Sequence, residues 1–227
     1  HFAQFVGRWF RTDEVTGVTR NNFPALTAEV KMAMAREVEE QFKHVMYNDN
    51  VPFSEFYSAD YTFLNNILAT YYGVTGNFSN DFTQVTVPQR GGPIASGAFM
   101  TVFAHAERTS PIRRAVHTRE MALCHHIDPP NSPLAADDID AQRAAAQAQV
   151  EAQESALGTP MSSKDFYFTY TNGIDACASC HERIINPMIG LEDFDNVGRL
   201  RESAGAGSVY EKLAGFDIAV DLSGSLM

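Results

Sequence analysis

The sequence predicts a mainly α-helical fold, and three observations support this prediction. Several long stretches repeat apolar residues every three or four positions and are bounded by helix start and stop signals. Only one short segment alternates in the way that a strand does. A polar run rich in alanine and glutamine at 135–157 reads as one further helix. With 44% hydrophobic residues in 227, the chain has enough apolar material for a sizeable core.

The first long helix is expected at residues 28–47. Thr27 is a suitable N-cap because its hydroxyl can accept a hydrogen bond from an early backbone amide. The apolar stripe of this helix consists of Val30, Met34, Val38, Phe42 and Val45. A second helix is expected to begin at Asp60, as its N-cap, and to run to Tyr72, where Gly73 ends it.

The middle of the chain contains the one strand signal. Residues 82–88 alternate as a short strand or extended segment. An Arg-Gly-Gly-Pro turn follows at 90–93, and its two glycines give it the conformational freedom that a tight reversal needs. We expect this turn to lead into a helix of small residues near 95–104.

A further helix has the clearest start signal in the sequence. Ser110 is a suitable N-cap, and Pro111 takes the first helical position, where its missing amide hydrogen is not needed. The helix is expected to continue to Cys124. Three basic residues on it are expected to form a solvated face: Arg113, Arg114 and Arg119.

The chain is expected to divide where its composition changes. Residues 125–130 contain two prolines and break the helical pattern. The Ala/Gln-rich helix that follows has little apolar stripe and ends at Gly158 and Pro160, so it lies on the surface or bridges two parts. We therefore predict a helical domain, a polar helical linker or insertion, and a small truncated C-terminal module, at 1–134, 135–160 and 161–227.

The net charge of −11 restricts the partners of this chain. Surfaces that bind nucleic acid are basic, so we expect no nucleic-acid partner. An acidic protein steers basic partners toward itself, so a partner protein is expected to be basic. No apolar run approaches the ~20 residues that a membrane helix needs. The abrupt C-terminal sequence suggests a segment of a longer protein.

The motif with the clearest chemistry is Cys177-Ala178-Ser179-Cys180-His181. In a C-x-x-C-H sequence the two thiols add to the vinyl groups of a haem and the histidine binds its iron, so the motif predicts one covalent haem c. Two alternatives remain open, a redox-active dithiol and a zinc site. Zinc needs about four ligands, and Cys124 is the only other cysteine. A thioredoxin-like dithiol is expected within a βαβ pattern, which is not visible here.

The sequence around this motif resembles the cytochrome-c-like module of large secreted proteins of planctomycetes and myxobacteria. After the motif, the matching residues are Pro187, Gly190, Leu191, Glu192, Phe194, Asp195, Gly198, Arg199 and Arg201. Before it, the matches are the segments 60–65, 68–69, 72–73, 90–92, 109–114, 123–124 and 129–130. This family joins a helical domain of unknown function (number 1592) to a following haem-c domain of unknown function (number 1588). Two departures are Asn186, where the family has aspartate, and the Ala/Gln-rich helix.

The resemblance implies a helical domain followed by a small haem-c module in an exported protein, located in the periplasm, the cell envelope or outside the cell. It also implies roles for matched residues. A backbone carbonyl near Asn186 and Pro187 would accept a hydrogen bond from the nitrogen of His181 that faces away from the iron. Arg199 or Arg201 would pair with a haem propionate or with Asp195.

The second axial ligand of the iron has several candidates. Met227 lies far enough downstream of His181 to reach the opposite face of the haem, and it is the preferred candidate. The alternatives are Met161, His125 and His126. Met188 is expected to pack in the core instead.

The functional expectation is an exported monohaem c-type cytochrome that passes single electrons to a redox partner protein, as part of a larger protein or multi-subunit envelope complex. The alternative is a haem-c enzyme of peroxidase or oxidase type, which needs an open iron position with an acid or base above it. The sequence contains neither a nucleophile elbow nor a His-Glu-x-x-His motif. The lack of another catalytic motif favours electron transfer.

Overall fold

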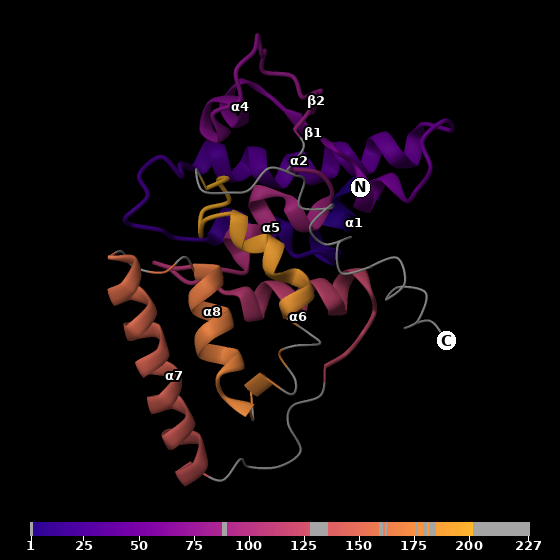
Figure 1. Cartoon of the computed structure of the whole chain (residues 1–227). Coiled ribbons are helices and arrows are strands. Elements are labelled where there is room, and N and C mark those ends of the chain that lie inside the picture. The colour runs from indigo at the N-terminus through magenta and orange to yellow at the C-terminus, as the bar shows by residue number, and fades with distance from the viewer. Residues whose placement is uncertain are drawn as a thin grey trace.

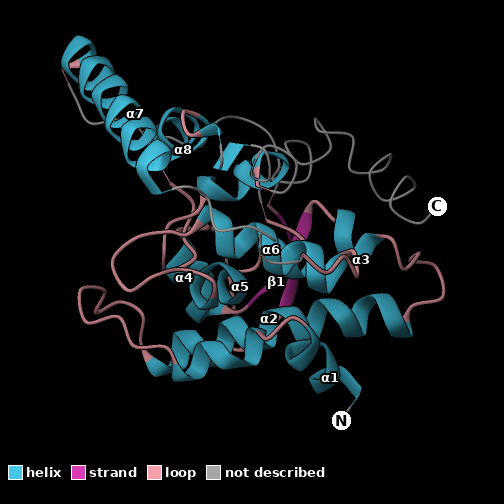
Figure 2. Ribbon diagram, turned by 90° about the horizontal axis from the view of Figure 1, so that it is seen from below, coloured by secondary structure: helices cyan, strands magenta, loops and turns pink. Residues whose placement is uncertain are grey.

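The computed structural model describes residues 2–87, 90–127, 136–158, 161, 163–175, 177–178, 181 and 185–201. The described part is mainly helical, as predicted, with one two-stranded sheet (Figure 1). In Figure 1 the sheet and α4 lie at one end of the molecule, and α7 and α8 lie at the other. Figure 2 shows α7 projecting from the other helices, with α8 beside it. Among the described residues, no helix combines the length and the apolar character required to cross a membrane.

The N-terminal part is built on α2 (Ala28–Tyr47), which packs against α1 (Phe2–Trp9) and η1 (Thr12–Gly17). The predicted cap is present, because the Thr27 side chain accepts a hydrogen bond from the amide of Val30. The predicted apolar stripe is buried in full. Two polar side chains that the stripe does not predict, Glu37 and Gln41, are buried on the same face.

The prediction of a helix beginning at Asp60 is wrong. The chain first forms α3 (Glu55–Ser58) and then β1 (Tyr61–Leu64), and α4 (Asn66–Tyr72) begins only after Asn65, whose side chain accepts from the amide of Leu68. β1 pairs antiparallel with β2 (Thr83–Thr86), in the register Tyr61↔Thr86 to Leu64↔Thr83. The strand is decided by this distant partner, which a local helix signal does not reveal. Gly73 ends α4 with φ +70°, as predicted.

The segment after the sheet is buried in the middle of the molecule. It contains η2 (Pro93–Ala95) and α5 (Gly97–Val102), in which every residue is buried. α6 (Pro111–Ala122) begins at the predicted cap, Ser110. The expected solvated basic face is wrong for two of its three residues, because Arg114 and Arg119 are buried and Arg113 alone is exposed.

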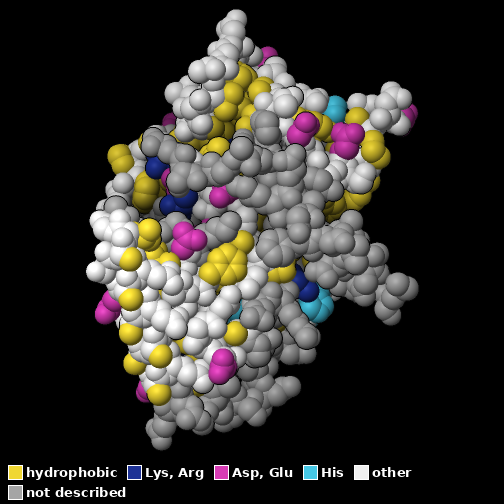
Figure 3. Space-filling view, in the orientation of Figure 1, with side chains coloured by type: hydrophobic (Ala, Val, Ile, Leu, Met, Phe, Trp, Pro, Cys, Tyr) yellow, Lys and Arg dark blue, Asp and Glu magenta, His cyan; other side chains and the backbone are white. Residues whose placement is uncertain are grey.

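The C-terminal part begins with α7 (Ala136–Leu157), the polar helix that the composition predicts. It packs beside α8 (Ser163–Asn172), and its buried side chains Ala146 and Val150 supply the apolar contact (Figure 1). In the space-filling view, α7 shows mainly small apolar and uncharged polar side chains with few charges (Figure 3). η3 (Asn186–Asp193) follows and packs on α6.

One hydrophobic core joins the two ends of the described chain. Its members from the C-terminal part are Tyr167, Ile185, Met188, Ile189, Leu191, Phe194 and Val197, and they pack with residues of α1, α2, α4 and α5. Met188 therefore lies in the core, as expected. The domain limits proposed from the composition stay a prediction, and the segment 185–197 packs as part of the N-terminal core.

Candidate cofactor site

The C-x-x-C-H motif follows α8 and is partly described. Cys177, Ala178 and His181 are described, whereas Ser179 and Cys180 lie outside the described residues. The amides of Cys177 and Ala178 both donate to the carbonyl of Ile174, at 2.8 and 2.9 Å, and the amide of Ile185 donates to the carbonyl of His181 at 2.8 Å. Both ends of the motif therefore lie on helical turns. The Cys177 thiol is half-buried and forms no disulfide within the described part.

The imidazole of His181 is held by Tyr167, a residue of α8. The Tyr167 hydroxyl lies 3.1 Å from Nδ1 of His181, and the two rings are nearly parallel at 10°, with centroids 6.2 Å apart. Burial lowers the pKa of His181, so its neutral form is favoured. Neutral imidazole is the form that binds a metal. Among the described residues, this ring forms its hydrogen bond at Nδ1 and none at Nε2.

The sequence did not identify Tyr167. The resemblance placed the partner of His181 at a backbone carbonyl near Asn186 and Pro187, but in the structure the Tyr167 hydroxyl is the partner of Nδ1. Pro187 is buried at the start of η3. The only available signal was a cluster of aromatic residues at 166–170, ahead of the motif, and nothing in it distinguishes one ring from another.

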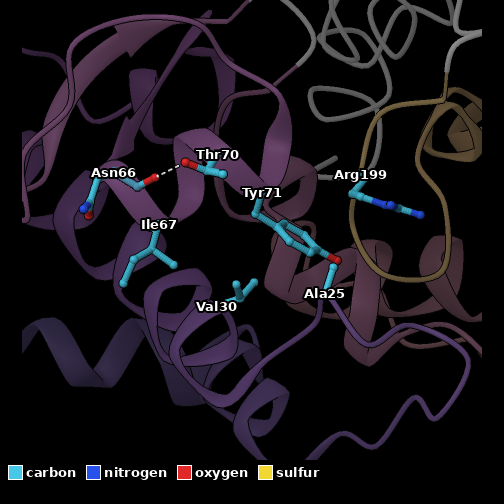
Figure 4. Close-up of a pocket in the computed structure, with 7 residues that line it drawn as sticks. All are labelled: Ala25, Val30, Asn66, Ile67, Thr70, Tyr71 and Arg199. Carbon is cyan, nitrogen blue, oxygen red and sulfur yellow. Dashed lines mark hydrogen bonds between the residues drawn. The ribbon is translucent and has the colours of Figure 1, made fainter.

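Arg199 lies on the side of the molecule formed by α2 and α4. Its Nε donates to Oδ2 of Asp195 at 2.9 Å, so the expected ion pair is present, and its guanidinium lies 5.8 Å from the ring centroid of Phe23. Arg199 lines a cavity of about 450 Å³ together with residues of α2 and α4. The Tyr71 side chain is part of the same lining (Figure 4). Within the described part, no contact joins Arg199 to His181.

A buried cation fixes the segment that follows the motif. The guanidinium of Arg114, on α6, is fully buried and forms an ion pair with Glu192 at 3.1 Å. It also donates to four backbone carbonyls, those of Met100, Leu191, Phe194 and Asp195. Thr109 donates to the other oxygen of Glu192. Burial lowers the pKa of Arg114 to about 10, which still leaves it charged at neutral pH.

A second buried cation, Arg90, connects the same segment to the N-terminal core. Its Nη2 donates to the carbonyl of Gly198 at 2.6 Å, and its guanidinium lies 3.6 Å from the ring centroid of Tyr72. Glu37 lies beside this group and accepts from Tyr72 at 2.8 Å and from Thr62 at 2.6 Å. Burial raises the pKa of Glu37, against the attraction of Arg90. These contacts hold residues 191–198 against the helices.

The candidates for the second axial ligand are placed differently from one another. Met227 lies outside the described residues. Met161 is half-buried and lines a cavity of about 330 Å³ whose wall includes Tyr167. His125 and His126 are exposed after α6, where His125 accepts from Nε of Arg119 at 3.2 Å. Of these three described candidates, Met161 lines a cavity together with the tyrosine that holds His181.

The residues present fit a haem c. The thiol of Cys177 is not engaged in a disulfide. Burial favours the neutral ring of His181, and its Nδ1 is paired with Tyr167, so Nε2 is the nitrogen that would bind iron. A zinc site would require a cluster of ligands; no group of three His, Cys, Asp or Glu residues that could hold a metal occurs among the described residues, which do not include Cys180 of the motif. Cys124, the third cysteine, is exposed at the end of α6 with φ +51°.

Comparison with protein families identifies both parts of the chain. Residues 1–74 match the family model PSD4, a protein of unknown function (DUF1592). Residues 90–204 match PSCyt3, a protein of unknown function (DUF1588), and this match covers half of the chain. No curated protein and no solved structure matches the chain. The order of the two matches is the order that the resemblance predicted, and the chain belongs to the DUF1588 (PSCyt3) family, with a DUF1592 (PSD4) segment ahead of it.

Proposed function

We propose that this chain is an exported monohaem c-type cytochrome that transfers single electrons within a larger protein or envelope complex. One observation carries the proposal: a complete C-x-x-C-H in which the Cys177 thiol lies outside any described disulfide and the His181 imidazole, whose neutral form burial favours, is paired at Nδ1 with Tyr167. On helical turns, side chains three and four positions apart share a face, which is the spacing of Cys177, Cys180 and His181 in the sequence.

In this proposal Cys177 and Cys180 form the two thioether bonds, and Nε2 of His181 is one axial ligand. The bound haem would supply a one-electron couple between ferric and ferrous iron. Met227 is proposed as the second axial ligand. Pro187 would contribute to the rigid segment after the motif, since it is buried at the start of η3. Nε of Arg199 donates to Asp195, so a propionate would pair with the two terminal nitrogens of its guanidinium.

The location and the partner follow from the chemistry of haem c and from the charge. Haem c is attached outside the cytoplasm, so we propose a periplasmic or extracellular location. The net charge of −11 favours a basic redox partner, whose association would slow as salt screens the attraction. Nothing among the described residues supports the alternative of a peroxidase- or oxidase-type enzyme.

The first experiment is to produce the chain with a periplasmic haem-attachment system and to record oxidised and reduced spectra, with and without carbon monoxide. Covalent haem with sharp low-spin reduced bands that do not respond to carbon monoxide would support electron transfer. A high-spin spectrum that changes with carbon monoxide would contradict it, because an open iron position would then be present. Absence of covalent haem would refute both haem proposals.

A matched pair of cysteine variants tests whether haem attachment depends on the motif or on any cysteine of the chain. Cys177→Ala removes one thioether bond, so denatured protein should retain a haem attached at a single position, with shifted reduced bands. Cys124→Ala changes the exposed cysteine outside the motif and should leave haem attachment unchanged. Equal effects of the two variants would contradict the assignment.

A further inference from the structure

We propose that Tyr167 is the positioning residue of the axial histidine: its hydroxyl accepts the Nδ1 hydrogen of His181 and so holds the imidazole with Nε2 directed to the iron. The inference rests on the proposed function. It is based on the 3.1 Å separation of the Tyr167 hydroxyl and Nδ1, and on the near-parallel rings, 10° apart.

The direction of the hydrogen bond follows from the chemistry of the ring. A neutral imidazole has one N–H group and one nitrogen that accepts. If Nε2 binds iron, the hydrogen must lie on Nδ1, and Nδ1 is the nitrogen that faces Tyr167. The hydroxyl oxygen is then the acceptor. Partners of this kind fix the tautomer and the orientation of a metal-binding histidine and raise its donor strength.

Tyr167 is held firmly enough for this role. Its side chain is 5% exposed and belongs to the hydrophobic core that includes η3. The helix that carries Tyr167, α8, packs on α7 and on η3. The Tyr167 ring itself lies edge-on to the ring of Phe168, with centroids 6.2 Å apart. A side chain packed in this way loses little further entropy when its hydroxyl bonds to His181.

Unlike a backbone carbonyl, a side-chain partner can be removed by substitution, so its effect on the midpoint potential can be measured. The hydrogen bond makes the imidazole a stronger donor, which favours ferric iron over ferrous iron. Tyr167→Phe should therefore raise the midpoint potential. We expect the ratio of ferrous to ferric protein at a fixed potential to rise about threefold to tenfold, and tenfold corresponds to ~59 mV for one electron.

The chain offers a matched control on the same helix. Tyr170 is half-buried on α8 and stacks on Phe166 at 5.4 Å between ring centroids, and the side-chain interactions of His181 within the described part are with Tyr167. Tyr170→Phe removes the same hydroxyl from the same kind of residue. It should leave the midpoint potential unchanged, so a shift confined to Tyr167→Phe cannot be attributed to the loss of any tyrosine hydroxyl.

The test combines potentiometry with NMR of the haem-loaded ferrous protein. In the unaltered protein, the Nδ1 hydrogen of His181 should exchange slowly with solvent and show a nuclear Overhauser contact to the Tyr167 ring. In Tyr167→Phe, this hydrogen should exchange about twofold to tenfold faster, as expected when one hydrogen bond is lost.

The outcomes distinguish the inference from the proposed function. If the unaltered chain carries no covalent haem, the proposed function fails. If haem is attached but Tyr167→Phe has the potential and exchange rate of Tyr170→Phe, the inference alone is overturned. If Tyr167→Phe does not fold, the contact between the Nδ1 hydrogen and the Tyr167 ring in the unaltered protein decides, and its absence overturns the inference.

Discussion

Replacing Arg114 by methionine should destabilise the protein far more than the same substitution of its neighbour Arg113. The substitution removes a fully buried guanidinium that pairs with Glu192 and donates to four carbonyls. It also leaves the Glu192 carboxylate buried without its cation. Removing one partner of a buried pair costs about 3–5 kcal/mol, which is a large share of the roughly 5–15 kcal/mol that holds a domain together.

The adjacent residue provides the control for this prediction. Arg113 is exposed, and its Nη1 donates to the carbonyl of Ala104 at 3.3 Å. Arg113→Met should change the free energy of unfolding by no more than about 0.5 kcal/mol. A double variant, Arg114→Met with Glu192→Gln, should recover about 1–3 kcal/mol of the loss, because the buried carboxylate is then neutral and can still bond to Thr109.

The assay is urea unfolding followed by circular dichroism, on proteins with the same haem content. The expected order of unfolding free energy is unaltered protein and Arg113→Met together, then the double variant, then Arg114→Met. The reasoning is refuted if the two single variants unfold within about 0.5 kcal/mol of each other. In that case the buried network would not be what holds residues 191–195 on α6.

Three further predictions concern the buried carboxylate, a close backbone contact and a helix cap. Burial raises the pKa of Glu37 above its usual 4.5, so this group favours folding below that pH, and its contribution is lost as the pH rises through the folded pKa. Unfolding measured against pH should therefore show the stability of Glu37→Gln rising relative to the unaltered protein above pH 4.5, and a constant difference would contradict the assignment. Gly198→Ala would place a Cβ 2.5 Å from the Gly97 carbonyl oxygen, whereas Gly158, also at positive φ, has open space around it. Gly198→Ala should thus cost more than Gly158→Ala, for which about 1 kcal/mol is expected, and equal melting temperatures would refute the close contact. Thr27→Ala should cost about 1 kcal/mol by removing the cap of α2, and an unchanged urea midpoint would show that the cap is dispensable.

Capping and stop residues correctly predicted where helices begin and end. Thr27 and Ser110 cap α2 and α6, and Gly73 ends α4, because each acts through backbone groups within a few residues of itself. The same kind of reasoning failed at Asp60. There the chain forms β1, since its partner β2 supplies the hydrogen bonds from about twenty residues away.

The buried arginines show the same limit. Arg113 and Arg114 are neighbours in the sequence, and nothing local distinguishes them. In the structure Arg113 is exposed and Arg114 is buried. Carbonyls of the segment 191–195 surround Arg114, and those groups are far away in the sequence. Only the packing of η3 on α6 brings them together and offsets the cost of burying the charge.

The sequence by itself determined the helical class, the caps of α2 and α6, the order of the two family segments and the C-x-x-C-H motif, because each is encoded in local runs of residues. The tertiary structure alone decided which side chains surround that motif. It placed the Tyr167 hydroxyl at Nδ1 of His181, and it placed Arg199 on the side of α2 and α4. Such contacts depend on how separate elements pack, and packing joins residues that no local pattern relates.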